Sequence, residues 1–211
     1  MTVDGTALVY TPNPGFFGDD GLKYRLVNTN ADQVSVNSGA AVALKVEAAL
    51  ALQGVVSDGP IANAKVVATL GTQTFSTDAD AQGRYSLPVR TSRPTDFLSL
   101  VATGVGVQST VVLSSLVGEA AGLAAQAKDG QLSSDTSPAL QVSHLTAAMT
   151  GLLAQAGPLP ATDVALADAM QQLNTEDLLD AAALVSWWWT VVWPCLRAWA
   201  TRKRCWPRPP R

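Results

Sequence analysis

The sequence predicts a mainly β protein with an α-helical C-terminal region, in which small antiparallel β-sandwiches in tandem are followed by a short helical bundle. Before about residue 113, apolar residues recur at every second position in short runs separated by turn residues, as in half-buried strands. From Ser114 the chain is rich in alanine and leucine, and apolar residues recur every three or four positions, as in helices. With 47% hydrophobic residues in a chain of 211, there is enough apolar material for these cores.

The first 48 residues predict a partial β unit, with strands at 6–10, 22–26, 34–36 and 42–46. Its Tyr10-Thr11-Pro12 strand end, its Phe-x-Gly-x-Asp turn at 16–20 and its alternating aromatic strand at 22–26 resemble bacterial immunoglobulin-like or cadherin-like repeats. The resemblance implies that Tyr10 and Tyr24 lie in a sandwich core. Such repeats have a further strand ahead of the Tyr-Thr-Pro element, so we expect an open sheet edge that favours pairing with another strand.

A second β unit is predicted at 50–113, after a short linker at 47–51. Gly59-Pro60 predicts a tight turn, because proline fixes φ and glycine adds backbone freedom. Strands are expected on both sides of that turn, and a polar turn at 78–83 then leads into a strand in which Tyr85, Leu87 and Val89 share the buried face. Two more strands are predicted, at 97–102 and 108–113.

The stretch from Leu52 to Val66, followed by Thr77-Asp78 and by Gly83-Arg84-Tyr85-Ser86-Leu87, resembles the carboxypeptidase regulatory-like family over about residues 50–104. That resemblance implies a transthyretin-like β-sandwich, an accessory module found in bacterial secreted and envelope proteins. It does not imply protease activity, because the chain lacks the zinc-binding His-x-x-Glu pair on which carboxypeptidase chemistry depends.

Four short helices are predicted from Ser114 to Val185. The first carries an apolar face of Leu116, Ala120, Leu123 and Ala127 and ends at Asp129-Gly130. The second is expected to start at the Ser137 cap and Pro138, with an apolar stripe of Val142, Leu145, Met149 and Leu152, and to stop at Gly157-Pro158. Thr162 should cap a third helix whose inward face holds Leu166, Met170 and Leu173, and Thr175 should open a fourth with Glu176 and Asp177 at its positive end.

Charge and composition change abruptly near Asp180. Residues 1–180 hold eight basic and seventeen acidic side chains, whereas 181–211 hold six basic and none acidic, together with all six tryptophans and both cysteines. Nucleic acid is therefore an unexpected partner, because binding to its phosphates needs basic side chains clustered on a folded surface.

Residues 186–211 form a tail rich in Trp, Arg and Pro that admits several interpretations. A spanning helix needs about 20 apolar residues, and Asp180, Pro194 and Arg197 leave too short a run, so membrane association is not expected. A surface-lying amphipathic helix is opposed by the tail's four prolines. We favour the hypothesis that the tail is translated out of the ancestral reading frame. Because Trp has a single codon, Trp187 to Thr190 is encoded by TGG TGG TGG ACN. In one shifted frame these bases encode an apolar residue followed by Val, Val and Asp. A genuine disordered tail is the fourth interpretation.

No catalytic or metal site is predicted. His144 is the only histidine, and the sequence has no Gly-x-Ser-x-Gly motif that would supply a nucleophile for it, so we expect a surface or capping residue. The cysteines, Cys195 and Cys205, lie in the tail. One histidine and two such cysteines make no zinc ligand set. Residues 78–83 resemble a calcium loop but have Val89 at the twelfth position, so a turn stabilised by its own side chains is expected. Asp19-Asp20 is expected to be a turn, and Gly104-Val105-Gly106 lacks a dinucleotide fingerprint.

Taken together, these patterns predict a non-catalytic structural or adhesion module of a modular bacterial cell-envelope or secreted protein, without cofactors. Its expected partners are neighbouring repeat domains of the same larger protein, with a surface protein or a glycan as further candidates. A signal peptide is not visible at residues 1–10, and we expect a missing front. Two alternatives stay open: a carbohydrate-binding accessory module of a larger secreted enzyme, and a membrane-associated protein anchored through its Trp-rich segment. Glycan binding would need exposed aromatic rings, and residues 1–180 contain no tryptophan.

Overall fold

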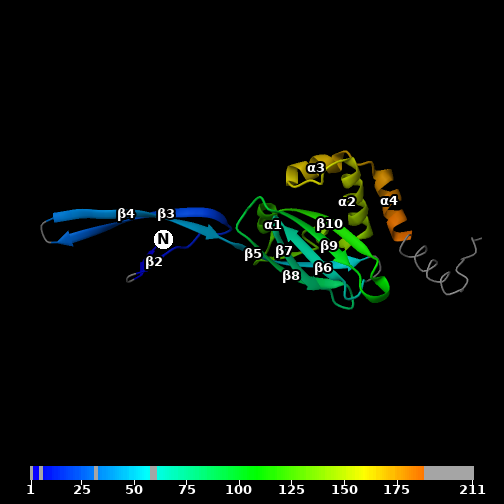
Figure 1. The fold of residues 1–211 in the computed structure, drawn as a ribbon, viewed down its shortest axis with the longest axis horizontal. Coiled ribbons are helices and arrows are strands. Elements are labelled where there is room, and N and C mark those ends of the chain that lie inside the picture. Colours follow the sequence, from blue (N-terminus) through cyan, green and yellow to red (C-terminus); the bar gives the residue numbers. More distant parts are fainter. Residues whose placement is uncertain (1, 5–6, 31–32, 58–60, 188–211) are drawn as a thin grey trace, which may run out of the picture.

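The computed structural model describes residues 2–4, 7–30, 33–57 and 61–187. Over these ranges the protein is mainly β with helices in its C-terminal half, which confirms the predicted fold class. Figure 1 shows an elongated molecule, in which a β-sandwich carries helices on one side and a long two-stranded ribbon reaches away from it.

Two sheets form the sandwich. One has the order β10-β9-β6-β7, and in the other β5 pairs with β8 on one edge. The strands are β5 (Ala48–Ser57), β6 (Lys65–Leu70), β7 (Gln73–Asp78), β8 (Arg84–Thr91), β9 (Phe97–Thr103) and β10 (Val112–Glu119). The turn predicted at Gly59-Pro60 lies outside the described residues.

Strict alternation of side chains builds the core between these sheets. In β8 every second residue is buried, and β5, β6 and β9 follow the same period. Tyr85 and Leu87 are buried as predicted, and so is Val66 on the facing sheet. The largest fully buried side chains are Leu52, Ile61, Leu70, Leu87, Leu98, Leu100, Leu113, Leu132, Leu140, Val56, Val66 and Val89.

The other edge of β5 is covered by a segment that the sequence predicted differently. β11 (Gln131–Ser133) and β12 (Val142–Ser143) both pair with β5 in parallel, and the 3-10 helix η2 (Pro138–Leu140) lies between them in the chain. The predicted helix from Pro138 is therefore wrong at its start. Pro138 opens only one 3-10 turn, and Val142 is buried in a strand because backbone pairing with β5 at Val56 outweighs its helical spacing.

The helices also begin later than predicted. Leu116 belongs to β10, which runs to Glu119, and the residues of the expected 108–113 strand are divided between η1 (Gly106–Gln108), a turn and the start of β10. α1 (Ala120–Gln126) is correspondingly short, and it precedes a turn at Asp129-Gly130 as expected. α2 (His144–Ala156) begins after Ser143, whose hydroxyl accepts a hydrogen bond from the Thr146 N–H.

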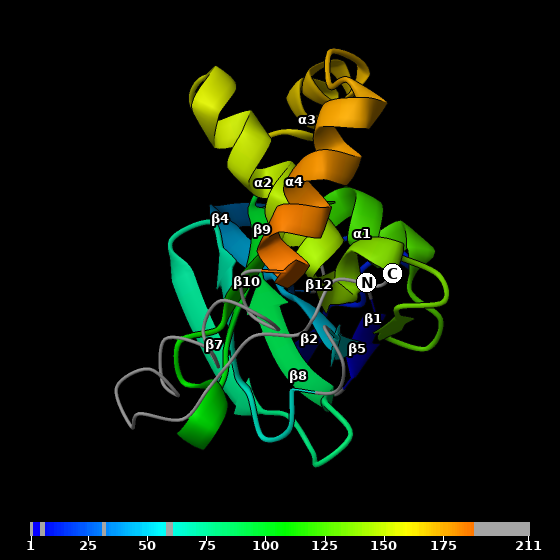
Figure 2. The ribbon, with the colours of Figure 1, turned by 90° about the vertical axis from the view of Figure 1, so that its right-hand side faces the viewer.

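α2 packs on β10 and also on α4 (Thr175–Trp187), as Figure 2 shows. The buried residues of α2 are Ala148, Thr150 and Leu153, so the predicted stripe is shifted around the helix. α3 (Asp163–Gln171) has the predicted cap, since the Thr162 hydroxyl accepts from the Ala165 N–H, but it buries no side chain. The inward face predicted for α3 is therefore wrong, and its Met170 is 46% exposed.

The N-terminal residues form two separate two-stranded sheets. β1 (Thr2–Asp4) pairs with β2 (Ala7–Val9), and β3 (Gly18–Asn30) pairs with β4 (Gln33–Val46). The two strands predicted at 34–36 and 42–46 are thus one long strand. We call β1–β4 the arm and the β3–β4 pair the ribbon (Figure 1).

The arm is attached to the sandwich without the predicted linker. Only Glu47 separates β4 from β5, so residues 48–51 belong to a sandwich strand rather than to a connection. Phe17, at the start of the ribbon, is buried in the sandwich core, and Gly18 lies close to Pro94. These contacts fix the base of the ribbon against the β8–β9 corner.

Candidate functional site

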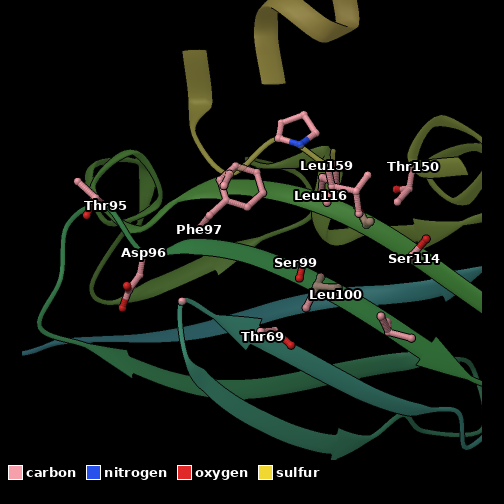
Figure 3. Close-up of a pocket in the computed structure, with 15 residues that line it drawn as sticks. Thr69, Thr95, Asp96, Phe97, Ser99, Leu100, Ser114, Leu116, Thr150 and Leu159 are labelled. Carbon is pink, nitrogen blue, oxygen red and sulfur yellow. The ribbon is translucent and has the colours of Figure 1, made fainter. Parts of the chain in front are cut away.

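A groove of about 430 Å³ lies on the outer face of the β10-β9-β6-β7 sheet, beneath the loop that joins α2 to α3 (Figure 3). Because Leu98, Leu100 and Ala102 of β9 face the core, their neighbours Ser99 and Val101 face outward into this groove. The residues that line it are Thr69, Gly71, Thr95, Asp96, Phe97, Ser99, Leu100, Val101, Ser114, Ser115, Leu116, Thr150, Leu159, Pro160 and Ala161.

The groove combines hydroxyl groups with apolar side chains. Thr69, Ser99 and Ser114 come from three neighbouring strands, and Leu159 covers them from the loop (Figure 3). Phe97 is its only aromatic side chain. Such a lining can hold an uncharged ligand by van der Waals contact and hydroxyl hydrogen bonds.

Among the described residues that line the groove, Asp96 is the only charged one, and its carboxylate makes contacts that stabilise the fold. The Thr91 hydroxyl donates a hydrogen bond to Asp96 Oδ2 over 2.6 Å, and both side chains are buried. The carboxylate also lies against Gly71, where a Cβ atom would come within 2.3 Å of Asp96 Oδ1. Asp96 therefore holds the β8–β9 corner to the β6–β7 turn.

The two most buried hydroxyl groups of the groove donate hydrogen bonds to backbone carbonyl oxygens. Ser115 is the most buried of them, and its Oγ donates to the Ala139 carbonyl oxygen over 2.6 Å. The Thr150 hydroxyl donates to the Thr146 carbonyl oxygen within α2. Among the described residues that line the groove there is no histidine, lysine or cysteine.

His144 is the first residue of α2 and is half-buried beside the Ser143 cap. The expected surface or capping residue is thus the half-buried residue that follows the cap, and it does not line the groove. The two cysteines, Cys195 and Cys205, are outside the described residues. Among the residues that are described, no three side chains of the metal-ligating types lie close enough together to hold an ion.

The turn at 78–83 is stabilised by its own carboxylate, as predicted. Asp80 Oδ1 accepts hydrogen bonds from the backbone N–H groups of Gln82 at 2.9 Å and Arg84 at 2.8 Å. Asp80 Oδ2 meets Arg84 Nε at 3.1 Å. The Arg84 backbone hydrogen bond is the largest of the effects that hold the pKa of Asp80 below its usual value.

Asp19 and Asp20 lie in strand β3, so the expected turn at these residues is wrong. The Tyr10 hydroxyl donates a hydrogen bond to Asp20 Oδ2, and the Gly21 N–H donates to Asp20 Oδ1. The hydrogen bond with Tyr10, followed by that from Gly21, lowers the pKa of Asp20. Tyr10 therefore connects the arm's first hairpin to its ribbon.

The three tyrosines occupy two different environments. Tyr85 is buried, and its hydroxyl donates to the Leu140 carbonyl oxygen over 2.6 Å; burial raises the pKa of this phenol. Tyr10 and Tyr24 are half-buried on the arm and lie in no sandwich core, contrary to expectation. Most of the tail, with five of its tryptophans, lies outside the described residues, and Trp187 ends α4.

The arm is the second candidate site, because its strands have no core of their own among the residues whose burial is described. Phe17 is the only buried hydrophobic residue before Leu50 among the residues whose burial is described, and its side chain belongs to the sandwich core. On the arm itself Leu8, Val9, Phe16 and Val42 are exposed by 38 to 44%. Alternating apolar residues in β4 predict that one face of this strand is apolar. Whether that face is buried depends on which segments pack against it, and a local sequence pattern does not reveal them.

Comparison with protein-family models, with curated proteins and with solved structures finds no match for this chain. Within the part of the chain that the structure describes, no helix has both the length and the apolar character needed to cross a membrane.

Proposed function

We propose that this chain is a non-catalytic structural or adhesion module of a modular bacterial cell-envelope or secreted protein. The resemblance of residues 50–104 to carboxypeptidase regulatory-like domains, and of the first 48 residues to immunoglobulin-like or cadherin-like repeats, supports this proposal. The hydroxyl groups and apolar side chains that line the groove also favour a binding role.

The observation that carries the proposal is the arm, whose described side chains form no core of their own. A two-stranded ribbon gains little stability alone in water, because one face and both edges stay solvated. The ribbon is nevertheless thirteen residue pairs long and is fixed at its base by Phe17. A long amphipathic ribbon held away from a stable sandwich has the form of an arm that docks on another protein surface.

The proposed partners are neighbouring repeat domains of the same larger protein, with surface proteins as further candidates. In a tandem array, an adjacent unit supplies the second layer that the ribbon needs. The sandwich then acts as the rigid base that sets the direction of the arm.

Hydrogen exchange tests this proposal. The backbone amides of β3 and β4 are compared between this chain alone and a longer protein in which it is joined to the neighbouring repeat domain that the proposal assigns to it. We expect strong additional protection of β3 and β4 in the longer protein, with unchanged protection of β6 and β9. Equal exchange of the ribbon in both proteins would contradict a docking role in an array.

Carbohydrate binding is the second candidate, favoured by the hydroxyl groups that line the groove beside Phe97. A glycan array with the wild-type chain and with Phe97→Ala tests it. A glycan that binds the wild-type chain and loses affinity with Phe97→Ala would support this candidate, and the absence of any binding would remove it.

A further inference from the structure

The ribbon has one apolar face and one polar face. In its register Leu22 pairs with Val42, Tyr24 with Ala40 and Asp20 with Leu44, so these side chains point to the same side. We define Leu22, Tyr24, Ala40, Val42 and Leu44 as the apolar ribbon face.

The intervening residues form the opposite face. There Asp19 pairs with Lys45, Gly21 with Ala43 and Lys23 with Ala41. The two faces differ in charge as a result: the polar face carries one acid and two lysines over these three pairs, whereas the side of the apolar ribbon face carries one acid, Asp20, whose carboxylate accepts the Tyr10 hydrogen bond.

The apolar ribbon face is only partly covered within the chain. The Tyr10 hydroxyl reaches Asp20, at the end of the face nearest the sandwich. Further along, Val42 is 38% exposed, and Leu22, Tyr24 and Leu44 are half-buried. A face of this kind in water favours a second apolar layer.

The balanced charge of the ribbon allows a second, identical ribbon to be the layer that covers this face. Residues 18–46 carry three acidic and three basic side chains, so two ribbons approach without net repulsion. Residues 47–187 carry thirteen acidic and five basic side chains, and contacts between two copies through that region are opposed by like charge.

Side-chain size also fits self-association. Tyr24 lies beside Ala40 on the same face, which places a large ring next to a small side chain. An identical face can set its ring against that small residue, as the two layers of a sandwich interdigitate about 10 Å apart. A two-fold dimer uses the same patch on both subunits, which this arrangement allows.

We propose that the apolar ribbon face packs face to face on the same face of a second copy of this chain. The proposal rests on the proposed docking role of the arm and names its partner. The apolar ribbon face covers residues 22–24 of β3 and 40–44 of β4, a length of about 14 Å at about 3.4 Å per residue, and is therefore small. Because stable complexes bury about 800 Å² per partner, the expected dimer is weak and forms at high micromolar concentration.

Sedimentation velocity of the full chain over a wide concentration range tests this association. We expect the weight-average mass to rise toward that of a dimer. Val42→Lys places a charge at the centre of the apolar ribbon face and should weaken dimerisation at least about tenfold. Ala41→Lys is the matched control, because it adds the same charge one residue away on the polar face, and it should leave dimerisation unchanged.

Cross-linking provides a second readout in a background with Cys195→Ser and Cys205→Ser. Under oxidation Val42→Cys should form dimers, whereas Ala41→Cys should not. A wild-type chain that stays monomeric at every concentration overturns the proposal, and so does a dimer that both lysine variants leave intact. A dimer abolished by salt but not by Val42→Lys would point to the basic residues 188–211 and also overturn it.

The outcome is separable from that of the docking role itself. A monomeric chain whose ribbon gains protection in the longer protein keeps the array proposal and removes only the second copy. Loss of both signals removes the docking role.

Discussion

At the residue scale, the most consequential contacts join segments that are far apart in the sequence. The Tyr85 hydroxyl donates a hydrogen bond to the Leu140 carbonyl oxygen, and the Ser115 hydroxyl donates one to the Ala139 carbonyl oxygen. Together these two bonds fix η2 between the two sheets. Gly54 makes this possible, because a Cβ atom there would lie 2.2 Å from the Leu140 oxygen. Alternation alone predicts that Tyr85 is buried, but it cannot predict a partner 55 residues away.

Tyr85→Phe should destabilise the fold by about 1 to 3 kcal/mol, because the buried Leu140 carbonyl then loses its donor. Gly54→Ala should cost at least as much, since its methyl group displaces η2. Urea unfolding measures both. Tyr24→Phe is the control, because Tyr24 is half-buried on the arm, and a loss of stability equal to that of Tyr85→Phe would contradict the assigned contact.

The Asp80 turn predicts a pH dependence with a definite sign. Its pKa in the folded protein is lowered from 3.8, first of all by the Arg84 backbone hydrogen bond. The stability that the carboxylate contributes is therefore fully present above its unfolded pKa and is lost as the pH falls through the lower folded pKa. Asp80→Asn should be less stable than wild type at neutral pH, and the difference should shrink in acid.

Urea midpoints measured from neutral pH into acid test this expectation. Asp78→Asn makes the same charge change two residues earlier, where no carboxylate hydrogen bond closes the turn, and it serves as the control. A difference between wild type and Asp80→Asn that stays constant over the whole range would count against the carboxylate's role.

At the scale of elements, the sequence predicts strands better than helices. Period-two alternation located β6, β8 and β9, because each strand buries one face against the same core. Between Ser114 and Ser143, alanine and leucine at helical spacing predicted helix, and this was right for α1 and wrong for the residues on both sides of it. There β10, β11 and β12 form because partner strands are available, and those partners are not visible in a local window.

The candidate groove was less predictable than the strands. Ser99 and Val101 could be assigned to an outward face from alternation, but Leu159 and Pro160 reach the groove through the packing of α2 on β10. A sequence pattern gives the period of α2 and not its position on the sheet, so it could not bring these residues together.

The docking of α3 depends on one carboxylate. Asp163 Oδ1 accepts a hydrogen bond from the Glu119 N–H at 2.8 Å, and the same oxygen lies 2.8 Å from where a Cβ atom on Gly118 would be. Because α3 buries no side chain, this contact is a large share of its attachment. Asp163→Ala should increase amide exchange in α3 and in the α2–α3 loop, with a global cost of about 1 kcal/mol.

Asp168→Ala is the matched control, because it removes a carboxylate from the same helix without touching β10. Hydrogen exchange followed by mass spectrometry reports both variants. Unchanged exchange in α3 after Asp163→Ala would mean that other contacts hold the helix.

At the scale of the whole molecule, two β units share one core residue. The arm contributes Phe17 to the sandwich and keeps no buried hydrophobic residue of its own among the residues whose burial is described. Because β4 leads through Glu47 directly into β5, strain or load on the ribbon passes along a nearly continuous backbone into the centre of a sheet. This connection suits an arm that must hold its direction, and a flexible linker would not.

Comparison of Phe17→Ala with Phe16→Ala tests whether Phe17 anchors the arm to the sandwich. Phe17 is 9% exposed within the sandwich core and Phe16 is 40% exposed beside it in sequence. Removing Phe17 should therefore destabilise the sandwich by about 3 to 5 kcal/mol, while removing Phe16 should cost well under 1 kcal/mol. Calorimetry measures the stability, and small-angle X-ray scattering measures the direction of the arm. A fully folded Phe17→Ala protein should show a broader distribution of long distances, because the base of the ribbon has lost its anchor; an unchanged distribution would show that the β4–β5 backbone alone aims the arm.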